Sequence, residues 1–122
     1  MRSLAGPSVR FTCQITDAAR RDLFACARAV IVPGEEDFGL VPIEAAAAGR
    51  PTVAFGAGGA LETVVEGVTG VFFREPTAAS LAQAMRSLDP AAFDVAAMRA
   101  HAQGFSAERF REKFRAVLSQ WL

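Results

Sequence analysis

The chain has 122 residues, of which 52% are hydrophobic and 21% are charged, and its formal net charge at pH 7 is zero. This composition predicts one folded domain and excludes a disordered tail, because an apolar chain of this length can bury a single core. No basic block and no basic stripe studded with aromatic residues is present, so we expect no nucleic-acid partner.

Between residues 9 and 73, short apolar runs alternate with helical patterns. The predicted strands are VRFTC (9–13), AVIVP (29–33), PTVAF (51–55) and GVFF (70–73), and the predicted helices between them lie near 18–27, 42–48 and 60–65. Such alternation is typical of a parallel sheet covered by helices. Asp17 is expected to cap the first helix, and Gly49 and Gly67 are expected to end the second and the third.

After the last strand the pattern contains helices alone. Phe105 and Phe110 are spaced for a hydrophobic staple at the start of the final helix. The expected helix starts are Thr77, Asp89 with Pro90, and Ser106, and Gly104 is expected to end the second of the three. The final helix carries an apolar stripe of Phe110, Phe114, Val117, Leu118 and Trp121.

Cysteine and histidine residues do not form a metal-binding pattern. Cys13 and Cys26 are too far apart for a CxxC pair and His101 is the only histidine, so we expect neither a zinc site nor a cofactor. The first residues lack an apolar stretch of signal-peptide length, and no apolar run approaches the roughly 20 residues of a spanning helix. We therefore expect no membrane span and a cytoplasmic protein with reduced thiols.

The most informative segment is PGEEDFGLVPIEAAAAGRP (33–51), in which seven residues separate Glu36 from Glu44. Gly39 allows the backbone to approach a ligand closely, and the helix that begins near Pro42 presents free N–H groups to an anion. Glu44 can accept hydrogen bonds from the paired hydroxyls of a ribose. Ordinary locations would also explain both carboxylates, namely a solvated loop for Glu36 and the helix dipole for Glu44.

The same segment resembles the nucleotide-sugar signature of retaining GT-B glycosyltransferases of group 1, also called family 4. The resemblance continues in GAGGALETVVEGVTGVFF (56–73) and FSAERF (105–110), and it covers residues 6 to 122. It implies the donor-binding C-terminal domain of such an enzyme, an α/β fold with a Rossmann-like three-layer parallel sheet and C-terminal helices. Because the complete enzymes have two domains, residues 1–122 are expected to be a partial nucleotide-sugar-binding domain, truncated at its N-terminus.

The resemblance also implies roles for individual residues. Glu36 matches the catalytic carboxylate that faces the transferred sugar, and Glu44 matches the carboxylate that binds the ribose. For Phe38 two alternatives stay open, stacking on the ligand and anchoring the loop in the core. The remaining implied contacts are the backbone N–H groups of Gly39, Leu40 and Val41 for the diphosphate, and Gln14 and Ile15 for the base.

One part of the family pattern has no match in this chain. The resembling domain begins with two strands and a helix that carry a basic pair for the diphosphate, and this chain starts after them. Arg10, Arg20 and Arg21 do not match that pair in context, so none of them receives its role. Losing these strands is expected to leave AVIVP (29–33) at a bare sheet edge, and a homo-oligomer is expected through this edge or the terminal helix.

The implied function is recognition of a nucleotide sugar for retaining, metal-independent glycosyl transfer, with no activity of the chain alone. GDP-mannose and UDP-sugars are the expected donors. The choice between them stays open because most relatives carry Gly and a basic residue where this chain has Cys13 and Gln14. Two other classes also remain open: a non-catalytic nucleotide-binding or interaction module, and an inert remnant of a glycosyltransferase.

Overall fold

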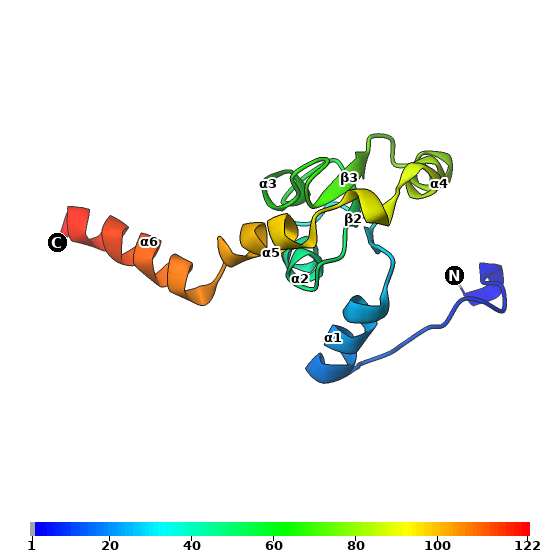
Figure 1. The fold of residues 1–122 in the computed structure, drawn as a ribbon, viewed down its shortest axis with the longest axis horizontal. Helices are drawn as coiled ribbons and strands as arrows, with labels where there is room; N and C mark the ends of the chain where they lie inside the picture. The colour runs from blue at the N-terminus through cyan, green and yellow to red at the C-terminus, as the bar shows by residue number, and fades with distance from the viewer. Residues whose placement is uncertain (1) are drawn as a thin grey trace.

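The computed structural model describes residues 2–122, with a parallel sheet at its centre (Figure 1). The three strands follow the order β1-β2-β3, and their register places Val30, Thr52 and Gly70 side by side. Each strand is part of a predicted apolar run, so three of the four predicted strands are confirmed. Their bounds are β1 (Val30–Val32), β2 (Thr52–Phe55) and β3 (Gly70–Phe73).

The first predicted strand, VRFTC (9–13), is wrong. These residues form an exposed irregular segment after the short 3-10 helix η1 (Arg2–Leu4), and none of the three strands pairs with them. Alternation of apolar and polar residues fits a half-buried strand, but a strand also needs a neighbour for its N–H and C=O groups. Within the described chain, β1 is consequently an edge strand, as expected from the sequence.

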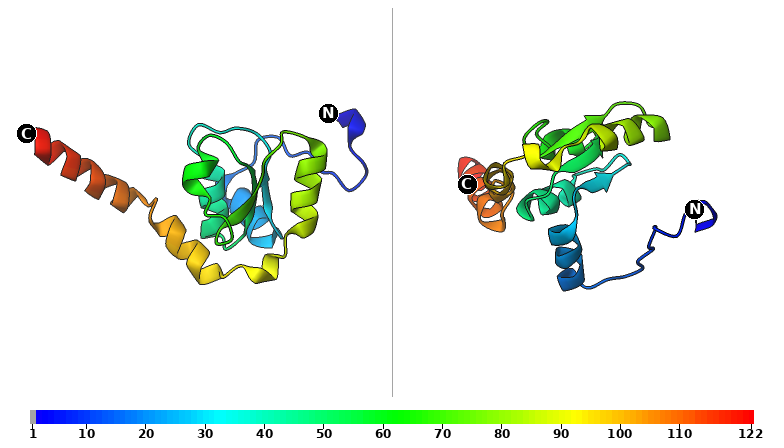
Figure 2. Two further views of the ribbon diagram at one scale, coloured as in Figure 1. Left: turned by 90° about the horizontal axis from the view of Figure 1, so that it is seen from above. Right: turned by 45° about the vertical axis from the view of Figure 1, so that its right-hand side comes forward.

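Helices cover both faces of the sheet. α2 packs against β1, β2 and α5, whereas α4 packs against β2 and β3. Figure 2 shows α4 across the sheet from α2 and α3, so the α/β Rossmann-like architecture is confirmed. The helices are α1 (Asp17–Cys26), α2 (Leu40–Ala47), α3 (Ala60–Thr63), α4 (Ala78–Ser87), the 3-10 helix η2 (Pro90–Ala92), α5 (Val95–Gln103) and α6 (Ala107–Trp121).

Two buried clusters hold these layers together. The first lies between the sheet and α3, and the second between α2 and α5, where Met98 is almost fully buried. Because large-to-small changes in such cores cost about 2 to 5 kcal/mol, these clusters hold α3 on the sheet and α5 on α2. The first cluster contains Val32, Ala54, Ala60 and Val64, and the second contains Ile43, Ala46, Met98 and Ala102.

Several helix ends agree with the sequence. Thr77 and Ser106 cap α4 and α6 with their hydroxyl groups, and Gly104 caps the C-terminal end of α5. Gly49, at a φ of 72°, directly follows the C-cap of α2. These predictions are confirmed because capping depends on local chain geometry, which the local sequence specifies.

Other helix ends differ from the prediction. Thr16 caps α1 in place of Asp17, because its hydroxyl accepts a hydrogen bond from the Ala19 N–H at 3.2 Å. Asp89 opens only η2, and α5 starts after Asp94, whose carboxylate accepts from two N–H groups. In addition, α2 begins two residues before Pro42, at Leu40, and α3 ends at Thr63, before reaching Gly67.

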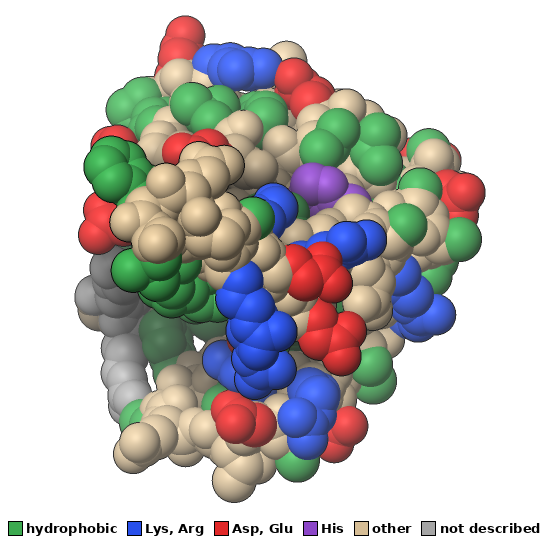
Figure 3. Space-filling model, turned by 90° about the vertical axis from the view of Figure 1, so that its left-hand side faces the viewer, with side chains coloured by type: hydrophobic (Ala, Val, Ile, Leu, Met, Phe, Trp, Pro, Cys, Tyr) green, Lys and Arg blue, Asp and Glu red, His purple; other side chains and the backbone are tan. Residues whose placement is uncertain are grey.

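α6 extends away from the sheet and buries none of its residues (Figures 1 and 2). On the face seen in Figure 3, basic, acidic and hydrophobic side chains are interspersed. Phe110 and Phe114 stack with their ring centroids 5.8 Å apart. The ring of Phe105 instead meets the ring of His101 edge-on, with a centroid distance of 5.3 Å. The apolar stripe predicted for this helix is therefore exposed in the structure.

Candidate functional site

Two loops meet at the carboxyl ends of β1 and β2 and support each other. The carbonyl of Glu36 accepts a hydrogen bond from the N–H of Gly59 at 2.6 Å, and Glu36 also forms an isolated parallel bridge with Gly58. Gly39 has a φ of 80°, and a Cβ atom there would lie 2.5 Å from Oγ1 of Thr63. Only glycine fits this position, and the hydrogen bond from Gly59 holds the backbone at Glu36.

A cavity of about 430 Å³ opens beside the first of these loops. It lies where the carboxyl ends of parallel strands commonly form a ligand-binding crevice. The structure thus brings together six of the eight residues selected from the sequence. The complete lining is Arg20, Glu36, Asp37, Phe38, Gly39, Leu40, Val41 and Glu44.

The N-terminus of α2 supplies hydrogen-bond donors to this cavity. Gly39 is the N-cap residue in the left-handed conformation, and it is followed by Leu40 and Val41 in the first turn. The N–H groups of these three residues donate to no acceptor within residues 2–122. Because the helix dipole adds partial positive charge at the same point, this end of α2 can bind an anion.

Phe38 is one of the residues that line the cavity. Its side chain is 57% exposed, so it does not anchor the loop in the core. An aromatic ring in this position offers an apolar face on which a planar or sugar ring can stack. Stacking of Phe38 on a ligand stays a prediction.

Glu44 forms an ion pair that the sequence did not predict. Its Oε1 lies 3.1 Å from Nη2 of Arg20, and the same nitrogen lies 3.2 Å from Oδ1 of Asp17. The side chains of Glu44 and Arg20 are 37% and 45% exposed, so solvent reaches both. Helical spacing placed Arg20 on α1, but no local signal could show that α1 lies against α2.

The same ion pair borders a second cavity of about 440 Å³ between α1 and α2. Phe24 and the alanines of both helices give this cavity an apolar wall. Arg20 and Glu44 are the two residues that line both cavities. The complete lining is Asp17, Arg20, Arg21, Phe24, Ala25, Glu44, Ala47, Ala48 and Arg99.

Gln14 and Ile15 do not join the other predicted site residues. Both are exposed, and neither lines the cavity that contains Glu36 and Glu44. They follow the segment 9–13, which does not enter the sheet, so nothing carries them to the carboxyl ends of the strands. A role of these two residues in base recognition stays a prediction.

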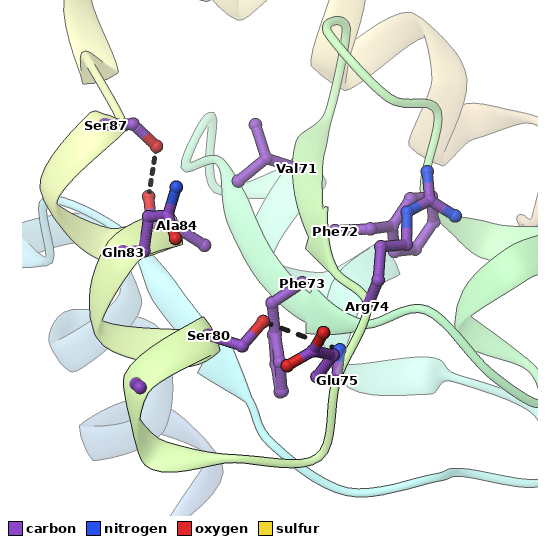
Figure 4. Close-up of a pocket in the computed structure, with 10 residues that line it drawn as sticks. Val71, Phe72, Phe73, Arg74, Glu75, Ser80, Gln83, Ala84 and Ser87 are labelled. Carbon is purple, nitrogen blue, oxygen red and sulfur yellow. Dashed lines mark hydrogen bonds between the residues drawn. The ribbon is translucent and has the colours of Figure 1, made fainter.

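A further cavity of about 400 Å³ lies between β3 and α4 (Figure 4). Its hydroxyl groups are engaged locally, because Ser87 donates to the Ala84 carbonyl at 3.1 Å and Ser80 accepts from the Glu75 N–H at 3.5 Å. Figure 4 shows these side chains on α4 and the loop facing it. No residue of this cavity lines the one with Glu36 and Glu44, and it is not our candidate.

The parallel sheet, the helix N-terminus and the flanking carboxylates are the features expected of a nucleotide-binding α/β domain. The family of group 1 glycosyl transferases matches residues 1–89, and the chain belongs to this family.

Two curated relatives show how much of a whole protein the chain represents. It is 42% identical to glycogen synthase of Mycobacterium tuberculosis (strain CDC 1551 / Oshkosh) over 88 residues, which are 70% of this chain and 21% of that protein. It is 36% identical over 117 residues to D-inositol 3-phosphate glycosyltransferase of Actinosynnema mirum, covering 92% of this chain and 28% of the relative. The chain therefore spans less than a third of either relative.

Solved structures give the same picture of the fold. Sucrose-phosphate synthase from Thermosynechococcus elongatus matches with a TM-score of 0.84 and 31% identity, over 95% of this chain and 31% of that one. The Anabaena protein Alr3699/HepE in complex with UDP matches with a TM-score of 0.64 and 28% identity, over 80% of this chain and 29% of that one.

Among the residues that our structure describes, no helix combines the length and apolar character needed to cross a bilayer.

Proposed function

We propose that this chain recognises the donor of a glycosyl transfer reaction, a nucleoside-diphosphate sugar, at the cavity between Glu36 and Glu44. One observation carries the proposal: a single cavity is lined by two carboxylates and by Gly39, Leu40 and Val41, whose N–H groups have no acceptor within residues 2–122. Membership of the group 1 family supports it, as does the similarity to the Anabaena protein in complex with UDP.

Each part of a nucleotide sugar has a matching group in this cavity. The diphosphate oxygens accept hydrogen bonds from the N–H groups at the start of α2, where the helix dipole favours negative charge. Glu44 accepts hydrogen bonds from the ribose hydroxyls. Glu36 faces the transferred sugar and stabilises the positive charge that develops at the anomeric carbon as the diphosphate leaves.

The proposed reaction is retaining and independent of a metal ion. The N–H groups at the start of α2 stabilise the negative charge on the leaving diphosphate, a task that Mg²⁺ performs in many phosphate sites.

For the donor base, two candidates have support. The EEDFGLVPIEA segment (35–45) resembles that of relatives that use GDP-mannose. The Anabaena protein is in complex with UDP, which favours a UDP-sugar. GDP and UDP therefore both belong in the first binding experiment.

We propose binding of the donor without turnover for these 122 residues. In the enzymes that the sequence resembles, the reaction takes place in a cleft between two domains. This chain spans 21% of the Mycobacterium relative. Transfer to an acceptor is a property that we assign to the whole enzyme, and an assay of these residues with donor and water or simple sugar acceptors is expected to show no product.

Isothermal titration calorimetry with UDP, GDP and ADP tests the proposal directly. We expect weak binding of at least one nucleotide, in the high-micromolar to millimolar range, and a clear loss of affinity in Glu44→Ala. Glu62→Ala is the matched control, because it removes an exposed carboxylate from the first turn of α3. Absence of heat with all three nucleotides at millimolar concentration would refute the proposed function.

The exposed surfaces also lead us to propose association with a second copy of the chain. β1 lacks a strand neighbour on one side within the described residues, and α6 buries none of its side chains. An open strand edge exposes N–H and C=O groups that pair readily with another strand. We expect two copies to associate through this edge, through α6, or through both.

A further inference from the structure

The proposed donor cavity has an unfavourable charge balance for its ligand. Its lining contains three carboxylates, those of Glu36, Asp37 and Glu44, and one cationic side chain, that of Arg20. A diphosphate is multiply negative at neutral pH, so it is repelled by the carboxylates unless a cation lies close to it. The N–H groups at the start of α2 offset only part of this repulsion, since a helix end carries roughly half an elementary charge.

Arg20 is held at the border of this cavity by two acidic groups. Nη2 of Arg20 donates to Oδ1 of Asp17 in the preceding helical turn and lies 3.1 Å from Oε1 of Glu44. Its Nε and Nη1 atoms donate to no other described residue. A guanidinium group has five N–H donors in a fork that suits phosphate oxygens, so several donors remain for a ligand.

We propose that Arg20 is the cationic contact for the diphosphate of the donor, with Glu44 and Asp17 fixing its position. This inference rests on the proposed function. Glu44 then serves two groups at once, because one oxygen orients the guanidinium while the other remains for the ribose. Arg20 thus brings its positive charge to the cavity from α1, whereas the carboxylates of Glu36 and Glu44 come from the loop after β1 and from α2.

Two alternatives to this proposal predict different effects of substitutions. If the ion pair only blocks Glu44 in the empty site, removing Arg20 should tighten binding of the ribose. If the diphosphate instead enters the second cavity, Arg21 and Arg99 should matter as much as Arg20, since both line that cavity and neither lines the first.

The test compares uridine and UDP as ligands of the full chain, measured by calorimetry at two salt concentrations. Arg20→Gln should weaken UDP binding by about 10- to 100-fold, as expected for loss of a hydrogen bond between charged groups. It should leave uridine binding unchanged and reduce the salt dependence of UDP binding. Arg20→Lys should restore part of the loss, and Arg21→Gln, which removes the same charge from the same helix, should bind UDP like the unmodified chain.

Each other outcome overturns the inference in a distinct way. No binding of UDP, GDP or ADP by the unmodified chain removes the proposed function and this inference with it. Normal UDP binding by Arg20→Gln removes the inference alone, and tighter binding identifies the ion pair as a block. Equal losses for uridine and UDP show a structural role of Arg20, and losses in Arg21→Gln or Arg99→Gln place the anion in the second cavity.

Discussion

Replacing Gly39 with alanine should destabilise the chain more than the same change at Gly67, a glycine of similar conformation. Gly39 and Gly67 have nearly equal φ values of 80° and 79°. A Cβ atom at Gly67 meets nothing within 4 Å, whereas at Gly39 it would lie 2.5 Å from Oγ1 of Thr63 and 3.0 Å from the Gly59 carbonyl oxygen. Comparing alanine variants at these two positions therefore separates the cost of backbone strain, which both share, from the cost of steric overlap, which only Gly39→Ala has.

The expected magnitudes follow from these two effects. A left-handed conformation costs an alanine about 1 to 2 kcal/mol, partly offset by the lower entropy of its unfolded chain. We therefore expect Gly67→Ala to lower the free energy of unfolding by about 1 kcal/mol. Overpacking adds about 1 to 3 kcal/mol, so Gly39→Ala should lower it by about 2 to 4 kcal/mol.

Urea unfolding followed by circular dichroism measures both variants. Thr63→Ala alone and together with Gly39→Ala completes a double-mutant cycle, because it removes the Oγ1 atom that a new Cβ would meet. The double variant should be more stable than the sum of the single effects predicts. If Gly39→Ala and Gly67→Ala lose the same stability, the close approach of Gly39 to Thr63 is not what requires glycine there.

Three further predictions concern the site, the packing of α5 and the assembly. Glu44→Ala should weaken binding of nucleotide and nucleotide sugar alike, whereas Glu36→Ala should weaken only the nucleotide sugar; equal effects of Glu36→Ala on both ligands in calorimetry would refute this division. His101→Ala removes a 2.8 Å hydrogen bond to the Thr63 carbonyl and should lower the free energy of unfolding by about 1 to 2 kcal/mol, while Gln103→Ala, an exposed change on α5, should not. Sedimentation equilibrium should show a dimer or larger species, and a monomer at all concentrations would contradict the proposed association.

The sequence was most informative where a feature depends on neighbouring residues. Apolar runs bounded by proline and glycine located β1, β2 and β3, and the residues around Gly39 lie together in space because they are contiguous in the chain. The segment 9–13 has an equally regular pattern and still forms no strand. A period of two specifies which face is apolar, but it does not specify whether another strand is within reach.

The remaining differences involve contacts between distant parts of the chain. Arg20 and Glu44 are 24 positions apart and meet only because α1 approaches α2. No periodicity within either helix contains that information. The prediction that Asp89 starts this helix was wrong for a related reason. Both are good capping residues, and the packing of Met98 against α2 decides where the longer helix begins.

The four residues of α3 connect the C-terminal helices to the candidate catalytic carboxylate. At one end the Thr63 carbonyl is bonded to His101 of α5, and at the other the Gly59 N–H is bonded to the carbonyl of Glu36. So short a helix has little room to absorb a shift by bending. α3 therefore links α5 to the loop that carries Glu36 through one hydrogen bond at each end, and we expect a change in the packing of α5 to reach this loop.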